Sequence, residues 1–319
     1  MSGRFVISLD FELMWGVRDH RSVADYGDAV LGARQAIPQL LELFERYDIR
    51  ATWATVGLLF ARNRDEMRKF APTLRPTYDN TGLSPYAALD QIGVDETDDP
   101  HHFGRSLLDR IAGTKGQEIA THTYGHVYAL EPGMTPEAWR ADLTAAIAIA
   151  KEAGHQMRSI VFPRNQMGPE HVAICQELGL TVIRGNPPGS VYRPRSGNEL
   201  TSWVRALRFL DGALPLLGPV GFTLPVMGDV IDVPASRFLR PWNARFPLYS
   251  SLHQRLIRRE MTQAAKAGQG YHLWWHPHNM GCNTDRNMAQ LQAILQHFTD
   301  LRDRYDFQSA NMGAFGADA

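Results

Sequence analysis

The sequence is short of several features that would mark particular classes of protein. It has only two cysteines among its 319 residues, so a disulfide framework is not expected and a reducing compartment is the simplest setting. The formal net charge of -1 gives no reason to expect nucleic acid as a bulk electrostatic partner. No apolar run of about 18 residues occurs, which predicts that no segment spans a membrane. The N-terminus does not show the apolar core of a signal peptide, and these absences together predict a cytoplasmic protein.

What the chain does contain is a regular alternation of strand-like and helix-like segments. Such an alternation favours a parallel sheet with crossover helices. With about seven or eight strands the sheet can close into a barrel, in which the chemistry gathers at the C-terminal ends of the strands. Strands are expected at residues 5–9, 49–56, 159–162, 181–184, 230–234, 271–278 and 307–311, with one more just before His122. Helices are expected at residues 28–44, 57–70, 105–111, 136–153, 169–178, 202–217, 250–267 and 285–304.

The chain is predicted to form a single domain over residues 1–319 with two irregular insertions. The first, at about residues 72–103, carries an acidic run, and the second, at about 185–229, is rich in Pro, Gly and Arg. Long loops in compact domains tend to be functional or mobile. Because segments of the same kind resume after residue 103, the first insertion is not interpreted as a linker between domains.

Two histidines four residues apart, His122 and His126, are the strongest chemical signal in the sequence. Neutral imidazole is the commonest protein ligand for a transition metal. On a helical turn, residues at this spacing point the same way, so both rings could hold one divalent ion. The spacing is also found in zinc proteases, but the glutamate that serves them as a base is absent here. Taken alone, the pair is ambiguous, because surface or core histidines are the alternative to a metal site.

Acidic and basic side chains follow other expected strands. Asp10 and Glu12 come at the end of the first strand, and their spacing puts both on one face. Two acids placed there are costly unless they are solvated, paired or bound to a cation, although an ordinary polar loop is the alternative. Arg164 and His276 occupy corresponding positions after later strands. The barrel interpretation therefore brings all these side chains to one edge of the sheet.

These motifs resemble the polysaccharide deacetylases of the NodB-homology superfamily (carbohydrate esterase family 4). The resemblance runs from about residue 4 to 311 and implies a distorted parallel (β/α) barrel, usually of seven strands. The first motif of the family ends a strand with a catalytic base and a metal ligand, which correspond to Asp10 and Glu12. The usual acids are adjacent, whereas these are spaced Asp-x-Glu, so an exchange of the two roles is the alternative. The second motif, His-[Ser/Thr]-x-x-His, matches residues 122–126 in full and implies that His122 and His126 are metal ligands.

The remaining motifs of the family match less completely. Arg164 matches the arginine that contacts the base, while Asn165-Gln166-Met167 replaces the rest of that motif and leaves the N–H of Met167 at the oxyanion position. His276, in Leu-Trp-Trp-His, resembles the general acid of the last motif, and Trp274 shares its face and could stack on a sugar ring. Asp232, before Val-Pro, is the nearest candidate for the fourth motif.

The resemblance implies a metal-dependent hydrolase that removes an acetyl or formyl group from an N-acylated sugar. Zinc suits two imidazoles and a carboxylate, and nickel or cobalt could replace it. A precursor in surface polysaccharide biosynthesis, linked to a nucleotide or a lipid, is the expected substrate. The alternatives are a small-molecule amidase like the allantoinase branch of the superfamily, and an inactive carbohydrate-binding protein.

A basic stretch near the C-terminal half bears on the substrate. Residues 191–259 contain ten arginines but only four acidic residues, together with an apolar helix expected at 202–217. A solvated basic face beside an ordinary core helix is one interpretation. The other is that arginines such as Arg193 and Arg195 bind the phosphate of the carrier. If the carrier is a lipid, the helix could make peripheral contact with a membrane surface.

Overall fold

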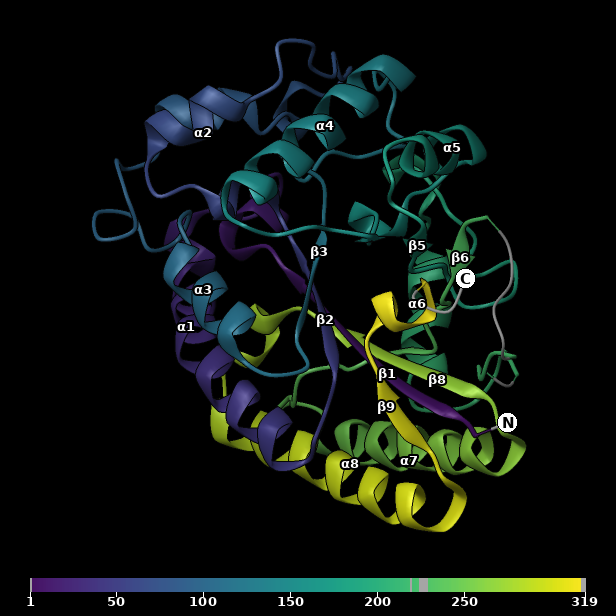
Figure 1. Cartoon of the computed structure of the whole chain (residues 1–319). Helices are drawn as coiled ribbons and strands as arrows, with labels where there is room; N and C mark the ends of the chain where they lie inside the picture. The colour runs from purple at the N-terminus through teal and green to yellow at the C-terminus, as the bar shows by residue number, and fades with distance from the viewer. Residues whose placement is uncertain (1, 219, 224–228, 317–319) are drawn as a thin grey trace.

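The framework of the protein is a curled sheet of parallel strands covered by helices (Figure 1). The computed structural model describes residues 2–218, 220–223 and 229–316. The order of the strands is β6-β5-β4-β3-β2-β1-β8-β7, and β9 pairs with β1 in addition. The strands are β1 (Arg4–Phe11), β2 (Ala51–Thr55), β3 (Glu118–Thr121), β4 (Ser159–Ile160), β5 (Val182–Ile183), β6 (Ile231–Asp232), β7 (Arg237–Phe238), β8 (Gly270–Trp275) and β9 (Gln308–Ala310).

The four residues between β6 and β7 join the two edges of this sheet. On one side, the backbone N–H of Ala235 donates to the carbonyl of Gly185 at 2.9 Å, just beyond β5. On the other side, the N–H of Ser236 donates to the carbonyl of His272 in β8 at 2.8 Å. The strands β6 and β7 therefore act as one bent strand, so that β1 to β5, this bent strand and β8 occupy about seven positions, close to the expected number. The prediction of a distorted parallel (β/α) barrel is confirmed.

Eight helices connect and cover the strands of the described part of the chain. They are α1 (Val23–Arg46), α2 (Arg64–Phe70), α3 (Arg105–Gly113), α4 (Pro136–Glu152), α5 (Pro169–Glu177), α6 (Ser202–Asp211), α7 (Pro247–Ala267) and α8 (Thr284–Tyr305). The start of α4 is as predicted, since the Thr135 hydroxyl accepts from the N–H of Ala138 at 3.2 Å. None of these helices is long and apolar enough to cross a membrane.

Three helix boundaries differ from the prediction by five residues or more. The helix expected at residues 57–70 begins only at Arg64, after a short 3₁₀ helix at Gly57–Phe60. The first helix was expected to begin after Asp28, but α1 begins at Val23, because Ser22 and Asp25 form a capping box whose backbone N–H to carboxylate bond is 2.7 Å. The helix expected at 202–217 ends at Asp211, and residues 212–217 are turns and irregular chain. The length of α6 matters for the apolar surface that it presents.

Along β1, side chains that pack in the main hydrophobic core alternate with side chains that lie on the inner face of the barrel. Phe5, Ile7 and Leu9 belong to the main hydrophobic core, which also contains apolar side chains from the covering helices. Val6 belongs to a smaller cluster with residues of β2, β5 and β6. Because side chains alternate faces along a strand, Asp10 lies on the same face as Val6. The strand that builds the core therefore also places a carboxylate inside the barrel, at its C-terminal end.

Candidate metal centre and active site

The structure gathers the predicted residues at the C-terminal ends of the strands. Asp10 is near the end of β1 and Glu12 follows it, His122 follows β3, and His276 follows β8. Because the strands are parallel, these ends meet at one edge of the barrel. Asp10, Glu12 and both histidines of the second motif are buried, whereas the His276 side chain is about one quarter exposed (24%).

Glu12, His122 and His126 form a compact group of buried ligand atoms. Oε2 of Glu12 lies 3.3 Å from Nε2 of His122 and 3.0 Å from Nε2 of His126. One nitrogen or oxygen from each residue falls within 4.8 Å of the other two. Two imidazoles and one carboxylate with further positions left open is the ligand pattern of a catalytic zinc site.

The hydrogen bonds around the two imidazoles agree with a role as ligands. The Nδ1 of His122 lies 2.7 Å from the carbonyl oxygen of Val161. This contact assigns the proton to Nδ1, so that Nε2 carries a lone pair on the side of Glu12. The Nδ1 of His126 is buried without a partner among the described residues. Burial lowers the pKa of His126 to about 4, so this ring is neutral, as a metal ligand must be. The residues present therefore fit a divalent ion.

The loop that carries the two histidines is not the helical turn that their spacing suggested. Thr123 and His126 have positive φ angles of 65° and 55°, and residues 122–128 are irregular. The two rings nevertheless converge, with centroids 4.9 Å apart. The helical interpretation was wrong because an i, i+4 spacing can also be bridged by a loop with left-handed residues.

Asp142 of α4 holds this loop in place. Its buried carboxylate accepts from the backbone N–H groups of Tyr124 at 2.6 Å and Gly125 at 3.2 Å, and from the hydroxyl of Tyr86 at 2.6 Å. Burial raises the pKa of Asp142 to about 6, and these donors only partly offset it. The sequence analysis did not find this residue, although an acid among the apolar positions of a helix is a signal that it could have used.

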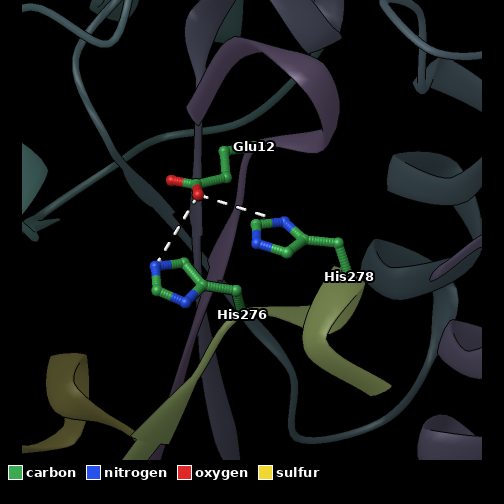
Figure 2. Close-up of side chains that lie close together, drawn as sticks. All are labelled: Glu12, His276 and His278. Atoms are coloured by element: carbon green, nitrogen blue, oxygen red, sulfur yellow. Dashed lines mark ion pairs between the residues drawn. The ribbon is translucent and has the colours of Figure 1, made fainter. Parts of the chain in front are cut away.

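The other carboxylate oxygen of Glu12 faces a second pair of histidines (Figure 2). Oε1 lies 3.6 Å from Nε2 of His276 and 4.0 Å from Nδ1 of His278, and these three residues form a second group that could hold an ion. Its distances are longer than those to His122 and His126, and Nδ1 of His276 is engaged by Oδ1 of Asn279 at 3.0 Å. The first group is therefore the better candidate for a metal site, and it does not include His276.

Asp10 is paired with Arg184, and not with Arg164 as expected. The Arg184 guanidinium donates to both carboxylate oxygens of Asp10, at 2.6 and 2.8 Å, from a position directly after β5. Arg164 pairs with Asp19 and lies 4.1 Å over the ring of Tyr128. Arg164 has a φ of 55° in the turn after β4, and its guanidinium is directed to Asp19 and Tyr128 instead of Asp10.

A chain of buried polar groups supports the Asp10–Arg184 pair. Arg184 also donates to the Ser8 hydroxyl at 3.0 Å and to the Asn165 side-chain oxygen at 3.1 Å. Ser8 in turn lies 2.8 Å from Nε2 of His272, a buried ring whose pKa burial lowers to about 3. Sequence reasoning missed Arg184 and His272, although both lie in the expected strands 181–184 and 271–278.

The charges around the two acids keep them ionised. Burial by itself raises the pKa of Asp10, but the charge of Arg184 and its hydrogen bonds to the carboxylate bring the pKa below its ordinary value. Burial likewise raises the pKa of Glu12, and its interactions with His276, followed by those with His126 and His122, bring it well below the ordinary value. Both carboxylates are therefore ionised near neutral pH.

The remaining predicted residues have less defined surroundings. Asp232 lies on β6, where it pairs with Ile183 of β5. Burial raises the pKa of the Asp232 carboxyl to about 6. In the described part of the chain its Oδ1 has no hydrogen-bond partner and it makes no ion pair with Arg184. The assignment of Asp232 to the fourth motif and of the Met167 N–H to the oxyanion stays a prediction.

Comparison with known protein families shows which family the chain belongs to. A sequence model of the polysaccharide deacetylase family matches residues 23–183, about half of the chain, including both histidines of the second motif. The chain belongs to the polysaccharide deacetylase family. The predicted membership of the NodB-homology superfamily is thereby confirmed, and the family supports a deacetylase function in general terms. No match was found among curated proteins.

Solved structures share the fold of this deacetylase at low sequence identity. A candidate polysaccharide deacetylase from Mycobacterium smegmatis has a TM-score of 0.63 at 16% identity, over 99% of this chain and 90% of that one. A candidate polysaccharide deacetylase from Pseudomonas aeruginosa PAO1 has a TM-score of 0.53 at 12% identity, over 98% and 89%. Puue allantoinase has a TM-score of 0.52 at 12% identity, over 98% and 88%. At these identities the likeness concerns the fold alone.

Proposed function

We propose that this protein is a metal-dependent hydrolase that removes an acetyl or formyl group from an N-acylated sugar. The observation that carries the proposal is the convergence of Glu12, His122 and His126 on one point, with Asp10 and His276 beside it. Zinc is the ion that we propose, with nickel or cobalt as substitutes, because imidazole nitrogen and carboxylate oxygen suit all three. Bound there, the ion would supply Lewis-acid activation of a water molecule and of an amide carbonyl.

Asp10 is the proposed general base. Its Oδ2 lies 4.0 Å from Nε2 of His122, so it borders the ligand group without belonging to it. Arg184 fixes the carboxylate by two hydrogen bonds and keeps it ionised. Asp10 would take the proton from the water that attacks the carbonyl carbon of the acyl group.

His276 is the proposed general acid. Its Nε2 lies 3.7 Å from Oδ2 of Asp10 and 3.6 Å from Oε1 of Glu12, on the partly exposed side of the site. The hydrogen bond that Nδ1 donates to Oδ1 of Asn279 sets the orientation of the ring, so that Nε2 is the atom that can deliver a proton. When the C–N bond breaks, Nε2 would protonate the amine nitrogen, so that the products are a carboxylic acid and a free amino sugar.

The proposed substrate is a precursor in surface polysaccharide biosynthesis, with a nucleotide or a lipid as its phosphate-bearing carrier. A cytoplasmic site of action stays a prediction. A cavity lined by arginines next to Trp274 supports a carrier with phosphate groups. Trp274 itself presents an aromatic ring beside His276, with centroids 5.6 Å apart, and such rings are suited to stacking on a sugar.

The proposal is tested by reconstituting metal-free protein with zinc and measuring the release of amine and carboxylate from a panel of N-acetyl and N-formyl amino sugars. Equal amounts of the two products are expected, and Asp10→Asn should slow the release of both by about a hundredfold or more. A small cyclic amide such as allantoin belongs in the panel. If allantoin is the one compound that is hydrolysed, the protein is a small-molecule amidase and not a sugar deacylase. Zinc binding without turnover of any compound would favour an inactive carbohydrate-binding protein.

A further inference from the structure

A cavity of about 580 Å³ beside the candidate active site is lined by positive charge. Seven arginines contribute to its wall, and no aspartate or glutamate does, among the residues that the structure describes. Two of the seven are neutralised by carboxylates behind the wall, since Arg164 pairs with Asp19 and Arg237 pairs with Asp211 and Glu260. The other five, which have no carboxylate within 4.0 Å in the described chain, are Arg193, Arg195, Arg205, Arg208 and Arg240.

These five arginines differ in how firmly they are held. Arg195 and Arg208 both donate to the carbonyl of Val191, at 2.9 and 2.8 Å, and are thus fixed in place by the backbone. Arg193 and Arg205 are exposed and make no side-chain hydrogen bond within the described residues. Like charges gathered around a hollow repel one another, and an anion that binds among them removes this repulsion. Guanidinium groups match phosphate oxygens through paired hydrogen bonds.

The cavity shares a wall with the active site. Asn165 lines it and accepts a hydrogen bond from Arg184, the partner of Asp10. Trp274 lines it too, and the Arg184 guanidinium lies 4.2 Å from the centre of its ring. Phe238, a third lining residue, is packed against His276 with ring centroids 5.6 Å apart. An anionic group in the cavity and an acyl group at Asp10 can therefore belong to the same substrate.

Beyond the cavity, α6 and the start of α7 expose large apolar side chains. Asp211 is the one buried residue of α6, so the apolar side of this helix is not covered by the core of the protein. The ring of Phe209 stacks on Tyr249 of α7 at 4.3 Å and also lies 5.3 Å from the guanidinium of Arg240, which joins this surface to the cavity. We define the apolar patch as Trp203, Phe209, Leu210, Leu214, Leu216, Phe246 and Leu248.

We propose that the cavity binds the phosphate or diphosphate of a lipid-linked N-acylated sugar, while the apolar patch rests on the membrane that holds the lipid. An amphipathic helix with an uncovered apolar side next to basic residues is typical of proteins that lie on a membrane surface. A soluble nucleotide carrier would use the arginines but would give no reason for the patch. This inference rests on the proposed function for its substrate, but its two binding surfaces are independent of turnover.

The cavity is tested with inorganic pyrophosphate, titrated calorimetrically into metal-free protein at constant ionic strength. Metal-free protein is needed because pyrophosphate would otherwise bind the ion. Arg193→Ala combined with Arg205→Ala should weaken binding by about tenfold or more, as expected for lost charge-assisted contacts. The matched control combines Arg46→Ala with Arg304→Ala, two exposed arginines on α1 and α8, and should leave the affinity unchanged. Absence of pyrophosphate binding, or equal losses in both double variants, would overturn the phosphate site.

The lipid is tested by flotation with phosphatidylcholine vesicles, with and without a long-chain isoprenyl diphosphate. The protein is expected to float with the diphosphate vesicles and to lose this association in the Arg193/Arg205 double variant. Trp203→Ser with Leu248→Ser, at side chains 70% and 71% exposed, should weaken it several-fold without weakening pyrophosphate binding. The control, Leu74→Ser with Val94→Ser, removes apolar side chains 49% and 51% exposed in the first insertion and should have no effect.

Two outcomes of the flotation would contradict the lipid carrier. Pyrophosphate binding without flotation, together with tighter binding of a nucleoside diphosphate, would assign the cavity to a soluble nucleotide carrier. If both apolar double variants reduce flotation equally, the apolar patch is not the surface that contacts the membrane. Because neither measurement uses turnover, a protein that binds diphosphate vesicles but releases no amine would contradict the proposed function and not this inference.

Discussion

Arg184 donates one hydrogen bond to each carboxylate oxygen of Asp10, at 2.6 and 2.8 Å, and both side chains are buried. A buried carboxylate on its own would be partly protonated, because burial raises its pKa. The guanidinium is the largest of the positive influences that bring the pKa of Asp10 below its ordinary value instead. The pair thus orients the proposed base and keeps it ionised.

Replacement of Arg184 should move the acid limb of the pH–rate profile. In the native protein the lowered pKa keeps Asp10 ionised as the pH falls, so activity persists into the acid range. In Arg184→Gln only the effect of burial and the histidines remains, the pKa rises, and the limb should move to higher pH by about one unit or more. Arg184→Lys, which keeps the charge, should move it less. If Arg164→Gln shifts the limb and Arg184→Gln does not, the partner of the base is Arg164 and not Arg184.

Substitutions of Asp10 and Glu12 should have different effects, one on turnover and the other on metal binding. Asp10→Asn removes a base but no ligand, so metal content should be retained while kcat falls by about a hundredfold or more. Glu12→Gln removes the carboxylate that lies 3.0 and 3.3 Å from the two histidines, and should weaken metal affinity. Metal titration with kcat measured at saturating metal distinguishes the two. If Asp10→Asn loses metal and Glu12→Gln keeps it, the roles of the two acids are exchanged.

The sequence predicted most of the site because its motifs are local. Asp10, Glu12 and His276 each stand at the end of a recognisable strand, and parallel strands bring such ends to one edge. The convergence of these residues with His122 could therefore be expected without coordinates. The fold followed from the same alternation, apart from helix ends that depend on caps such as the Ser22–Asp25 box.

The parts that could not be predicted depend on long-range or backbone geometry. Arg164 and Arg184 both follow strand-like segments, and the sequence offers no reason to prefer Arg184. The choice is made by the left-handed turn at Arg164 and by the register of β5 in the barrel. Asp142 contacts a loop 17 and 18 residues away in sequence. An acid among apolar helix positions marks a buried carboxylate, but no local pattern predicts which loop it contacts.

His276 should control the alkaline limb of the pH–rate profile. A general acid must carry its proton before the amine leaves, so the rate should fall where this proton is lost. His276→Ala should lower kcat by about a hundredfold and remove that limb while metal content stays unchanged. The matched control is His297→Ala, on α8 and away from the site, which should preserve both limbs. Full activity in His276→Ala would transfer the role to another group, with buried His278 the nearest.

Loss of Asp142 should disturb the metal site from a distance. Asp142→Ala leaves two backbone N–H groups and one hydroxyl without their acceptor, which should cost about 2–4 kcal/mol of unfolding free energy and weaken metal affinity. Denaturant titration and metal titration measure the two effects. Asp65→Ala, at a side chain 92% exposed, should change neither. A destabilised Asp142→Ala protein with native metal affinity would show that this residue does not position the loop.

The central claim is that one ion is held by Glu12, His122 and His126, and elemental analysis of metal-loaded protein tests it most directly. About one zinc per chain is expected for the native protein, because one group of ligands is assigned as the site. His122→Ala should lose this zinc while remaining folded, and His278→Ala should retain it, since its Nδ1 lies 4.0 Å from Glu12 in the other group. Retention of zinc by His122→Ala with loss by His278→Ala would contradict the account.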